Sequence, residues 1–525
     1  TLSLHDALPI LKKQASLLLA GMLLITSLSA CGESPEPNTG EENGEHSSIT
    51  LRNYMALPTT DPADTNETGV LTVNEQIYEG LYALNEAEGG YDKLLAKEVE
   101  ISDDGTIYDI TLQDGVKFHN GETMTSADVV FSYEHFMANS KYNTYTNMIV
   151  DVEAVDDTHV RITLDRPYSP ILHTFYKVKI LSQKEVESQG DEFGTVANLA
   201  GTGPYSWDLD AYKPTTSWTL NAFEDYWQGA PSIKTINYVV IEDDAAAVIA
   251  LENGEIDWMT VPLANWDDIK NSGKFATDER QSNEIFFLSI NWEASDILAN
   301  DKVREAIAYA MDREAMNQIV CEGLGTVTNL YINPNYAEAA PTECDITYPH
   351  DVEKAKELLA EAGYPNGVDI GEIVVAAGRN EAYATVLQAN LAEAGITAKL
   401  TALEYGAAVD RSAIQDFDLY VAYDSGNYDF NNFRQQAHSE SVGIMTISFV
   451  GDKFDYKHFE ELFAEGERLT NEEDRRAVYT ELYNEVMATY CQLPMVVPPV
   501  CSAWNPDLNV VSVPTYYRVA DWSWS

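Results

Sequence analysis

The stretch DVEKAKELLAEAGYPNGVDIGEIVVAAGRNEAYATVLQANLAEAGITAKLTAL, residues 351–403, contains two helix–strand units in succession. Asp351 stands where a helix N-cap is expected, ahead of a segment with helical apolar spacing. The apolar run Ile373–Ala376 predicts a strand, Ala382–Ala394 a second helix, and Ile396–Leu403 a second strand. Helices and strands that alternate along the chain indicate an α/β fold.

The same alternation extends through most of the chain. Further strands are predicted at Ile49–Met55, Ile107–Leu112, Val160–Leu164, Ile236–Ile241, Ile285–Asn291 and Phe417–Ala422. Helices are predicted after the capping box Thr125–Asp128, over Lys302–Val320, and from Asn471 to about Tyr490. We therefore expect an α/β architecture with largely parallel sheets.

The charge balance excludes several classes of partner. The 525 residues include 85 acidic and 32 basic ones, which gives a net charge of −53. A nucleic-acid-binding protein needs a basic surface, and binding to anionic lipid by charge needs the same. At about 150 residues per domain, the length allows two to four domains or lobes.

Sequence motifs of enzymes and cofactor sites are missing. The chain has no phosphate-binding GxxxxGK[ST] loop, no GxGxxG after a strand, no HExxH and no GxSxG. Its nine histidines are scattered without the spacing of metal ligands. We expect neither an enzyme nor a cofactor or metal site.

The N-terminal segment has the layout of a secretory signal. Lys12 and Lys13 precede a short apolar run, which ends in Leu-Ser-Ala and Cys31 and resembles the bacterial lipobox. We interpret residues 1–30 as a signal peptide, of which residues 1–10 look like translated upstream sequence, and Cys31 as the lipid attachment site. Residues 31–48 predict a flexible tether. The expected location is the outer face of the cytoplasmic membrane, on the cell surface or facing a periplasm. The alternative interpretation of Cys31 is an ordinary buried cysteine.

Export also makes disulfides a reasonable expectation for the other four cysteines, Cys321, Cys344, Cys491 and Cys501. Four cysteines allow two disulfides in three connectivities. Cys321–Cys344 is the easiest pairing to defend, because it closes an irregular segment. Cys491–Cys501 is doubtful, since an extended strand between them would separate the two ends by about 30 Å.

The block ISDDGTIYDITLQDGVKFHNGETMTSADVVFS, residues 101–132, resembles the signature of the family 5 extracellular solute-binding proteins. These are the receptors of dipeptide, oligopeptide and nickel ABC importers. Six further blocks follow the family's order: QIYEGL (76–81), GTGPY (201–205), NAFEDYW (221–227), GEID (254–257), VREAIAYAMD (303–312) and DVEKAKELL with AGYP (351–365). The resemblance extends from about residue 50 to Trp524.

This resemblance implies a two-lobed α/β fold of the type II periplasmic-binding-protein (venus-flytrap) kind, with an extra subdomain in the first lobe. Lobe I would comprise residues 49–88, 200–285 and 503–525, the subdomain 89–199, and lobe II 286–502, with hinge strands near 285–291 and 495–503. Ligand contacts on both lobes would favour a closed form that the permease reads. A monomer is the family expectation.

The resemblance also implies residues for the charged ends of a peptide. A buried carboxylate or ammonium needs a charged partner. Arg379, in a loop between a strand and a helix, is the carboxylate candidate; its alternative is an ion pair with Glu381 or a neighbouring acid. Asp424 and Asp429 are the ammonium candidates. Asp424 is preferred because it follows the strand directly, and either could be an ordinary turn aspartate.

Two further groups are candidates to line the cleft. The backbone of Gly201, Thr202 and Gly203 could approach a ligand closely, or could form a simple inter-lobe turn. Tyr205 and Tyr405 could supply rigid aromatic faces with a hydroxyl group.

The sequence thus predicts a lipid-anchored receptor of an ABC importer for short peptides. Two alternatives stay open: the same fold with an oligosaccharide, a metal complex or another small solute as ligand, and a surface sensor without an importer. The loops 376–383 and 423–433 contain no histidine, which argues against nickel or haem.

Overall fold

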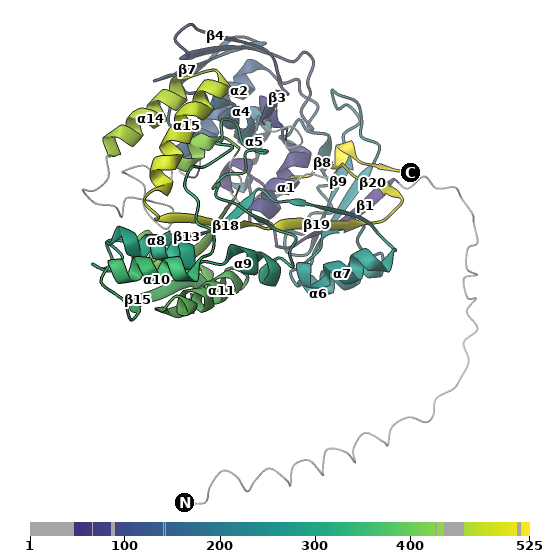
Figure 1. Cartoon of the computed structure of the whole chain (residues 1–525). Coiled ribbons are helices and arrows are strands. Elements are labelled where there is room, and N and C mark those ends of the chain that lie inside the picture. Colours follow the sequence, from purple (N-terminus) through teal and green to yellow (C-terminus); the bar gives the residue numbers. More distant parts are fainter. Residues whose placement is uncertain are drawn as a thin grey trace, which may run out of the picture. The chain divides into compact units, whose positions relative to one another are not determined.

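The computed structural model describes residues 47–65, 67–85, 90–139, 141, 143–425, 428–434, 456–511 and 516–525. The predicted signal peptide, Cys31 and almost all of the tether lie outside the described residues. Within the described part, no helix is both long and apolar enough to span a membrane. The described residues form two large mixed sheets and one four-stranded sheet, with their helices (Figure 1). Two small sheets pair β2 Tyr82–Leu84 with β3 Tyr91–Lys93 and β20 Leu508–Asn509 with β21 Ser523–Trp524.

The first sheet has seven strands in the order β12-β19-β11-β1-β10-β9-β8. Their bounds are β1 Ser48–Asn53, β8 Tyr205–Trp207, β9 Ser217–Ala222, β10 Thr235–Val240, β11 Trp258–Thr260, β12 Ala276–Gln281 and β19 Pro499–Trp504. β1 pairs in parallel with β10 and β11, and the other pairs are antiparallel. The associated helices are α1 Thr68–Ile77, α6 Asp244–Glu252 and α7 Leu263–Ser272.

The second sheet has six strands in the order β14-β18-β13-β17-β15-β16. Their bounds are β13 Glu284–Ile290, β14 Thr326–Val327, β15 Val368–Ala376, β16 Ile396–Leu403, β17 Leu419–Ser425 and β18 Gln492–Val497. Only β15 forms parallel pairs, with β16 and β17. The prediction of largely parallel sheets is therefore wrong. Short connections such as the one between β8 and β9 give antiparallel pairs, and strands that enter from the other sheet run against their neighbours.

The helices that accompany the second sheet are α8 Asp301–Ala310, α9 Arg313–Val320, α10 Val352–Glu361, α11 Arg379–Glu393, α12 Tyr405–Ala413, α14 Tyr456–Arg468 and α15 Glu472–Met487. Two of them, α10 and α15, begin at the caps expected from the sequence. Asp351 and Asn471 cap α10 and α15 through their side chains. The single helix predicted over residues 302–320 is two helices, because Asp312 caps a new one by accepting from the backbone of Ala315 at 2.8 Å.

A separate antiparallel sheet lies in the segment predicted as a subdomain. It comprises β4 Ala96–Ile101, β5 Ile107–Leu112, β6 Ile149–Asp156 and β7 His159–Leu164, in the order β4-β5-β7-β6. The helices α2 Ser126–Ala138, α3 Asn143–Thr146, α4 Ile171–Lys177 and α5 Gln183–Gln189 accompany it. The predicted capping box is present at α2, where Thr125 donates its backbone N–H to the Asp128 carboxylate at 2.9 Å.

The chain passes between the first and second sheets at two neighbouring points. One is Ser282–Asn283, between β12 and β13, and the other is Pro498, between β18 and β19. The backbone N–H of Ser282 donates to the carbonyl of Pro498 at 3.0 Å, so the two crossings lie side by side. Figure 1 shows β18 and β19 running end to end. The first crossing directly precedes residues 285–291 and the second lies within residues 495–503, the two segments predicted to form a hinge.

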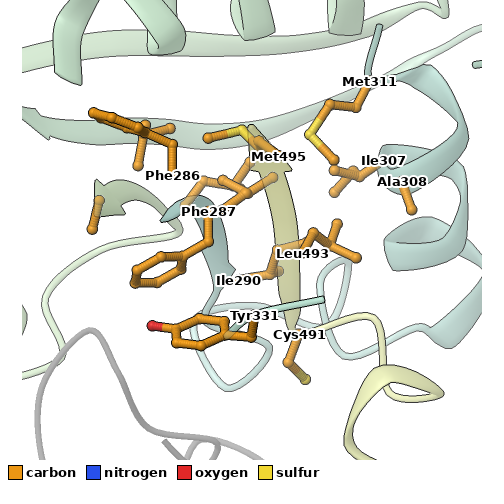
Figure 2. Close-up of a cluster of buried hydrophobic side chains, with 14 of the residues drawn as sticks. Phe286, Phe287, Ile290, Ile307, Ala308, Met311, Tyr331, Cys491, Leu493 and Met495 are labelled. Carbon is orange, nitrogen blue, oxygen red and sulfur yellow. The ribbon is translucent and has the colours of Figure 1, made fainter. Parts of the chain in front are cut away.

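The core of the second sheet fixes the position of β13. The ring centroids of Phe287 and Tyr331 lie 5.0 Å apart with the ring planes tilted by 54°, and Figure 2 shows the two side chains next to each other. On the other face of β13, Phe286 stacks on Tyr383 at 3.9 Å. Burying an aromatic side chain of this size stabilises the fold by about 2 to 3 kcal/mol. This packing holds Glu284, the first residue of β13, at the edge where a candidate site lies.

All four described cysteines are free thiols, so the predicted disulfides are not formed. The Sγ atom of Cys321 lies 2.9 Å from the Tyr383 hydroxyl rather than against Cys344. Cys491 is buried in the core of the second sheet, whereas Cys501 is buried in a different cluster beneath α6 and α7.

Candidate functional site

Arg379 is held in an ion pair. It is the first residue of α11 and follows Gly378, whose φ of +100° requires glycine. Its Nη1 and Nη2 donate to the two carboxylate oxygens of Glu284 at 2.7 and 3.3 Å. The guanidinium carbon lies 4.7 Å from the ring centre of Tyr423. A cation at a helix N-terminus interacts unfavourably with the positive end of the helix dipole, and the negative charge of Glu284 offsets this interaction for Arg379. The alternative interpretation of an ion pair is thus realised, with Glu284 in place of Glu381.

Asp424 lies near the end of β17, opposite Ile285 of β13. Its Oδ1 accepts a hydrogen bond from the backbone N–H of Ser425 at 2.8 Å. Burial and then the charge of Asp424 raise the pKa of Tyr145, which belongs to α3. The same two causes raise the pKa of Tyr331. The charge of Asp424 therefore acts on tyrosines from two separate parts of the chain.

The structure places Arg379 and Asp424 on opposite faces of the second sheet. Side chains alternate along a strand, so Tyr423 and Asp424 face opposite sides. Arg379 packs on Tyr423, on the face that also carries Glu284. Asp424 faces Tyr331 on the other side. The two residues predicted to hold the two ends of one ligand are therefore not brought together.

The second ammonium candidate, Asp429, is only 1% exposed. Both of its carboxylate oxygens accept hydrogen bonds from Nη2 of Arg475, at 2.8 and 2.7 Å. Its Oδ1 also accepts from the backbone N–H of Asn431 at 2.8 Å. An aspartate used in this way has no carboxylate surface for a ligand, and Asp424 stays the preferred candidate.

The Gly201–Gly203 segment is buried, so it matches the turn alternative and not a ligand-lining role. A Cβ atom on Gly201 would lie 2.1 Å from the carbonyl oxygen of Ile77. Thr202 donates its hydroxyl to the buried Glu79 at 3.0 Å, and Gly203 donates its N–H to Ile77 at 2.9 Å. These glycines allow two backbone segments to touch.

The two tyrosine candidates have opposite outcomes. Tyr205 is fully buried, and its hydroxyl donates to the carbonyl of Ile233 at 3.0 Å, so its predicted role at a ligand is wrong. Its place in β8, directly after the buried turn, makes it a core residue. Tyr405 starts α12 with 64% of its surface exposed. Tyr405 stays a candidate for a ligand contact.

The close contact at Gly201 gives a stability prediction. Gly201→Ala is expected to lower the free energy of unfolding by about 2 to 3 kcal/mol, because the new methyl group must displace the Ile77 backbone. Urea unfolding measures the change. Gly406→Ala, in α12, is the matched control; its new Cβ meets only the flexible end of Glu404, and it should be neutral or slightly stabilising. Equal stabilities of the two variants would contradict the contact.

Glu338 lies against Gly90, which directly precedes the short strand β3 Tyr91–Lys93. A Cβ atom added to Gly90 would lie 2.8 Å from Oε1 of Glu338. The Oε2 atom of Glu338 lies 3.9 Å from Nη1 of Arg475. Burial, and then the charge of Asp429, raises the pKa of Glu338 to about 7, while Arg475 opposes the rise and Glu472 adds to it. Burial, helped by the charge of Asp429, thus keeps this carboxyl group largely protonated below neutral pH.

This carboxyl group gives a pH prediction. The pKa of Glu338 is higher in the folded than in the unfolded protein, so the stability due to its proton is present below pH 4.5 and lost as the pH rises through about 7. Glu338→Gln should therefore match the wild type at pH 4 and be about 2 to 3 kcal/mol more stable at pH 8. Denaturant unfolding at both pH values measures this, with the exposed Glu357→Gln as control. An effect independent of pH would contradict it.

Several residues of the site were missed from the sequence. Glu284 directly precedes the predicted strand at residues 285–291, but only the packing of α11 on β13 brings it to Arg379. Tyr145 and Tyr331 reach Asp424 from positions far away in the chain. On the Asp424 face, a carboxylate close to the partly exposed Tyr145 could hold a ligand by a charged hydrogen bond and an aromatic contact.

These features define a class: an α/β protein in which two mixed sheets, joined at adjacent crossings, carry a binding surface of charges and aromatic rings. Residues 91–441 match bacterial extracellular solute-binding proteins, family 5 Middle, and the chain belongs to this family. Its members are binding proteins of transport systems. The predictions of the family, of the type II periplasmic-binding-protein fold, of a non-enzymatic function and of an extracytoplasmic location are thereby confirmed.

Individual relatives agree with this assignment. The glutathione-binding protein GsiB of Escherichia coli (strain K12) is 31% identical over 360 residues, which are 66% of this chain and 68% of GsiB. The solved structure of HbpA2 from Haemophilus parasuis has a TM-score of 0.80 at 24% identity, covering 91% of this chain and 100% of that one. The oligopeptide-binding protein AppA from Bacillus subtilis has a TM-score of 0.74 at 21% identity, covering 92% and 99%.

Proposed function

We propose that this chain captures short peptides and delivers them to the permease of an ABC importer. The observation that carries the proposal is Asp424, a strand-end carboxylate that faces Tyr145 and Tyr331. A desolvated ammonium group requires an acid of this kind. Tyrosine faces pack against varied side chains, and pairing to the peptide main chain tolerates many sequences. AppA was solved with a nonapeptide, and GsiB is named for binding glutathione.

Delivery requires a form that the permease can recognise. In this proposal residues 49–88, 200–285 and 503–525 form lobe I, residues 89–199 its subdomain, and residues 286–502 lobe II. The adjacent crossings at Ser282–Asn283 and Pro498 are where such lobes would hinge.

Contacts between the proposed subdomain and lobe II are of the kind that hold a closed form. The backbone N–H of Ser169 donates to the carbonyl of Glu467 at 2.7 Å. The Nδ2 of Asn431 donates to the Tyr168 hydroxyl at 3.3 Å. A ligand that bridges the lobes would add to these contacts and shift the population toward the closed form.

The chain would work at a membrane surface. The lipobox-like sequence before Cys31 supports lipid attachment there, and residues 31–48 would form a tether. Stable anchoring of this kind needs no membrane-spanning helix in the mature protein.

Native mass spectrometry of the purified protein with a random library of two- to six-residue peptides tests the function. Retention of peptides, removed by competition with an excess of one retained peptide, is expected. A protein that retains no peptide but carries a sugar or a metal complex through purification would contradict the proposal. A gene without a neighbouring permease and ATPase would argue for a sensor.

A further inference from the structure

A cavity of about 360 Å³ lies away from the second sheet. Its walls come from residues 75–94, which include the end of α1 and the paired strands β2 and β3, from residues 176–179, from Gln228 and from the C-terminal residues 511–521. All of these belong to the segments proposed as lobe I and its subdomain, whereas the peptide site is proposed in residues 286–502. The volume lies within the range of about 300 to 1,000 Å³ that is typical of small-molecule pockets.

Arg518 lines this cavity without a close ion pair. Within the described residues, no carboxylate oxygen lies within 4.0 Å of its guanidinium group, and the charges of Asp521, Glu79 and Glu75 act on it from farther away. Its neighbouring polar group is the hydroxyl of Tyr226, which donates to Glu79 at 2.7 Å. A partly buried guanidinium group with no carboxylate in direct contact favours the addition of an anion.

The two glutamates on the cavity wall are held by other groups. Glu75 accepts from Lys179 Nζ at 2.8 Å, so each neutralises the other. Glu79 is 3% exposed and accepts from the Thr202 hydroxyl at 3.0 Å. Because these bonds hold both acids and Lys179, Arg518 is the partly buried cation of this cavity that can take an added anion.

The rest of the wall limits the charge and the shape of a ligand. Asp92 and Asp521 are exposed at the cavity and would repel a second anionic group. Leu84 and Val511 offer apolar surface for a short carbon chain. A guanidinium group binds a carboxylate through two parallel hydrogen bonds. A small acid with one carboxylate and an apolar tail matches this wall.

We propose that the cavity beside Arg518 is a second ligand site, which binds a small monocarboxylic acid through its carboxylate. The apolar tail would lie against Leu84 and Val511. This site goes beyond the proposed function, since its ligand needs no contact with Asp424 and a bound peptide does not displace it. The two sites therefore fill independently.

Hexanoate, hexanamide and the dicarboxylate adipate share one chain length and differ in charge, so they test the assignment. Saturation-transfer NMR titrations of the full protein measure their affinities. The wild type should bind hexanoate about tenfold or more tightly than hexanamide, the usual effect of a charge-assisted hydrogen bond, and more tightly than adipate. In Arg518→Met the preference over hexanamide should fall below about threefold. Arg161→Met, which removes an exposed arginine paired with Asp109, should keep it.

A second variant and a competition complete the test. Ala83→Trp fills the cavity from β2 but keeps Arg518, and it should also weaken hexanoate binding, so the test holds if Arg518→Met unfolds. Equal hexanoate binding by the wild type and both cavity variants would overturn the inference, as would equal binding of hexanoate and hexanamide by the wild type. Displacement of hexanoate by a retained peptide would place the acid in the peptide site and overturn a second site. A protein that retains no peptide but binds hexanoate through Arg518 would contradict the proposed function and keep this inference.

Discussion

Asp424→Asn is expected to weaken the binding of peptides with a free N-terminus by about a hundredfold or more. The substitution keeps the size of the side chain but leaves the ligand ammonium without a negative partner. Truncating one member of a desolvated, hydrogen-bonded charge pair typically costs about 2 to 5 kcal/mol of binding free energy. Isothermal titration calorimetry with a peptide retained in the library experiment measures the loss.

The N-acetylated form of the same peptide is the ligand control. It lacks the ammonium group, so the wild type and Asp424→Asn should bind it with similar, weak affinity. Asp410→Asn, which neutralises an exposed acid of α12, is the protein control and should bind like the wild type. An Asp424→Asn variant that binds free peptides as tightly as the wild type would remove Asp424 from the site.

Local signals in the sequence predicted individual elements well. The strands at residues 107–112 and 396–403 have the predicted limits, and the caps at Asp351 and Asn471 are in place. These features depend on residues within one or two turns of each other, so they are visible in a single sequence. The direction of a strand relative to its neighbours is not visible in a single sequence, because it depends on which distant strands pair. The mixed sheets were therefore missed.

The candidate site was harder to predict than the secondary structure for the same reason: its contacts join residues that are far apart in the chain. Asp424 and Asp429 are both acids near the end of one predicted strand, and spacing alone gave only a preference between them. The structure separates them through Arg475, which lies 46 residues beyond Asp429 and uses both of its oxygens. Arg379 has the sequence position expected for a carboxylate anchor. Its partner Glu284 is 95 residues away, so the ion pair was an open alternative until the packing of α11 was known.

Glycine was overinterpreted for a related reason. A Gly-Thr-Gly turn permits close approach to a ligand or to another backbone, and the sequence does not say which. The contact between Gly201 and Ile77 decides it. Tyr205 follows that buried turn into β8, so its hydroxyl finds a backbone carbonyl in place of a ligand.

The buried pair of Asp429 and Arg475 gives the largest expected effect on stability. Arg475→Met should lower the free energy of unfolding at pH 7 by about 4 kcal/mol, because it leaves a buried carboxylate without a counter-charge. Burial already raises the pKa of Asp429, and removing Arg475 would raise it further. The loss should therefore shrink at pH 5, where the carboxyl group takes up a proton more readily.

The double variant Asp429→Asn/Arg475→Met should recover much of the stability lost in Arg475→Met, since no charge is then buried and the Asn side-chain oxygen can still accept from the backbone of Asn431. Arg161→Met, which breaks the half-exposed pair with Asp109, is the control and should cost no more than about 1 kcal/mol. Guanidinium unfolding of the four proteins at pH 5 and pH 7 measures these differences. A double variant no more stable than Arg475→Met would show that the arginine stabilises through its packing against Tyr479, 5.6 Å from its guanidinium carbon, and not through Asp429.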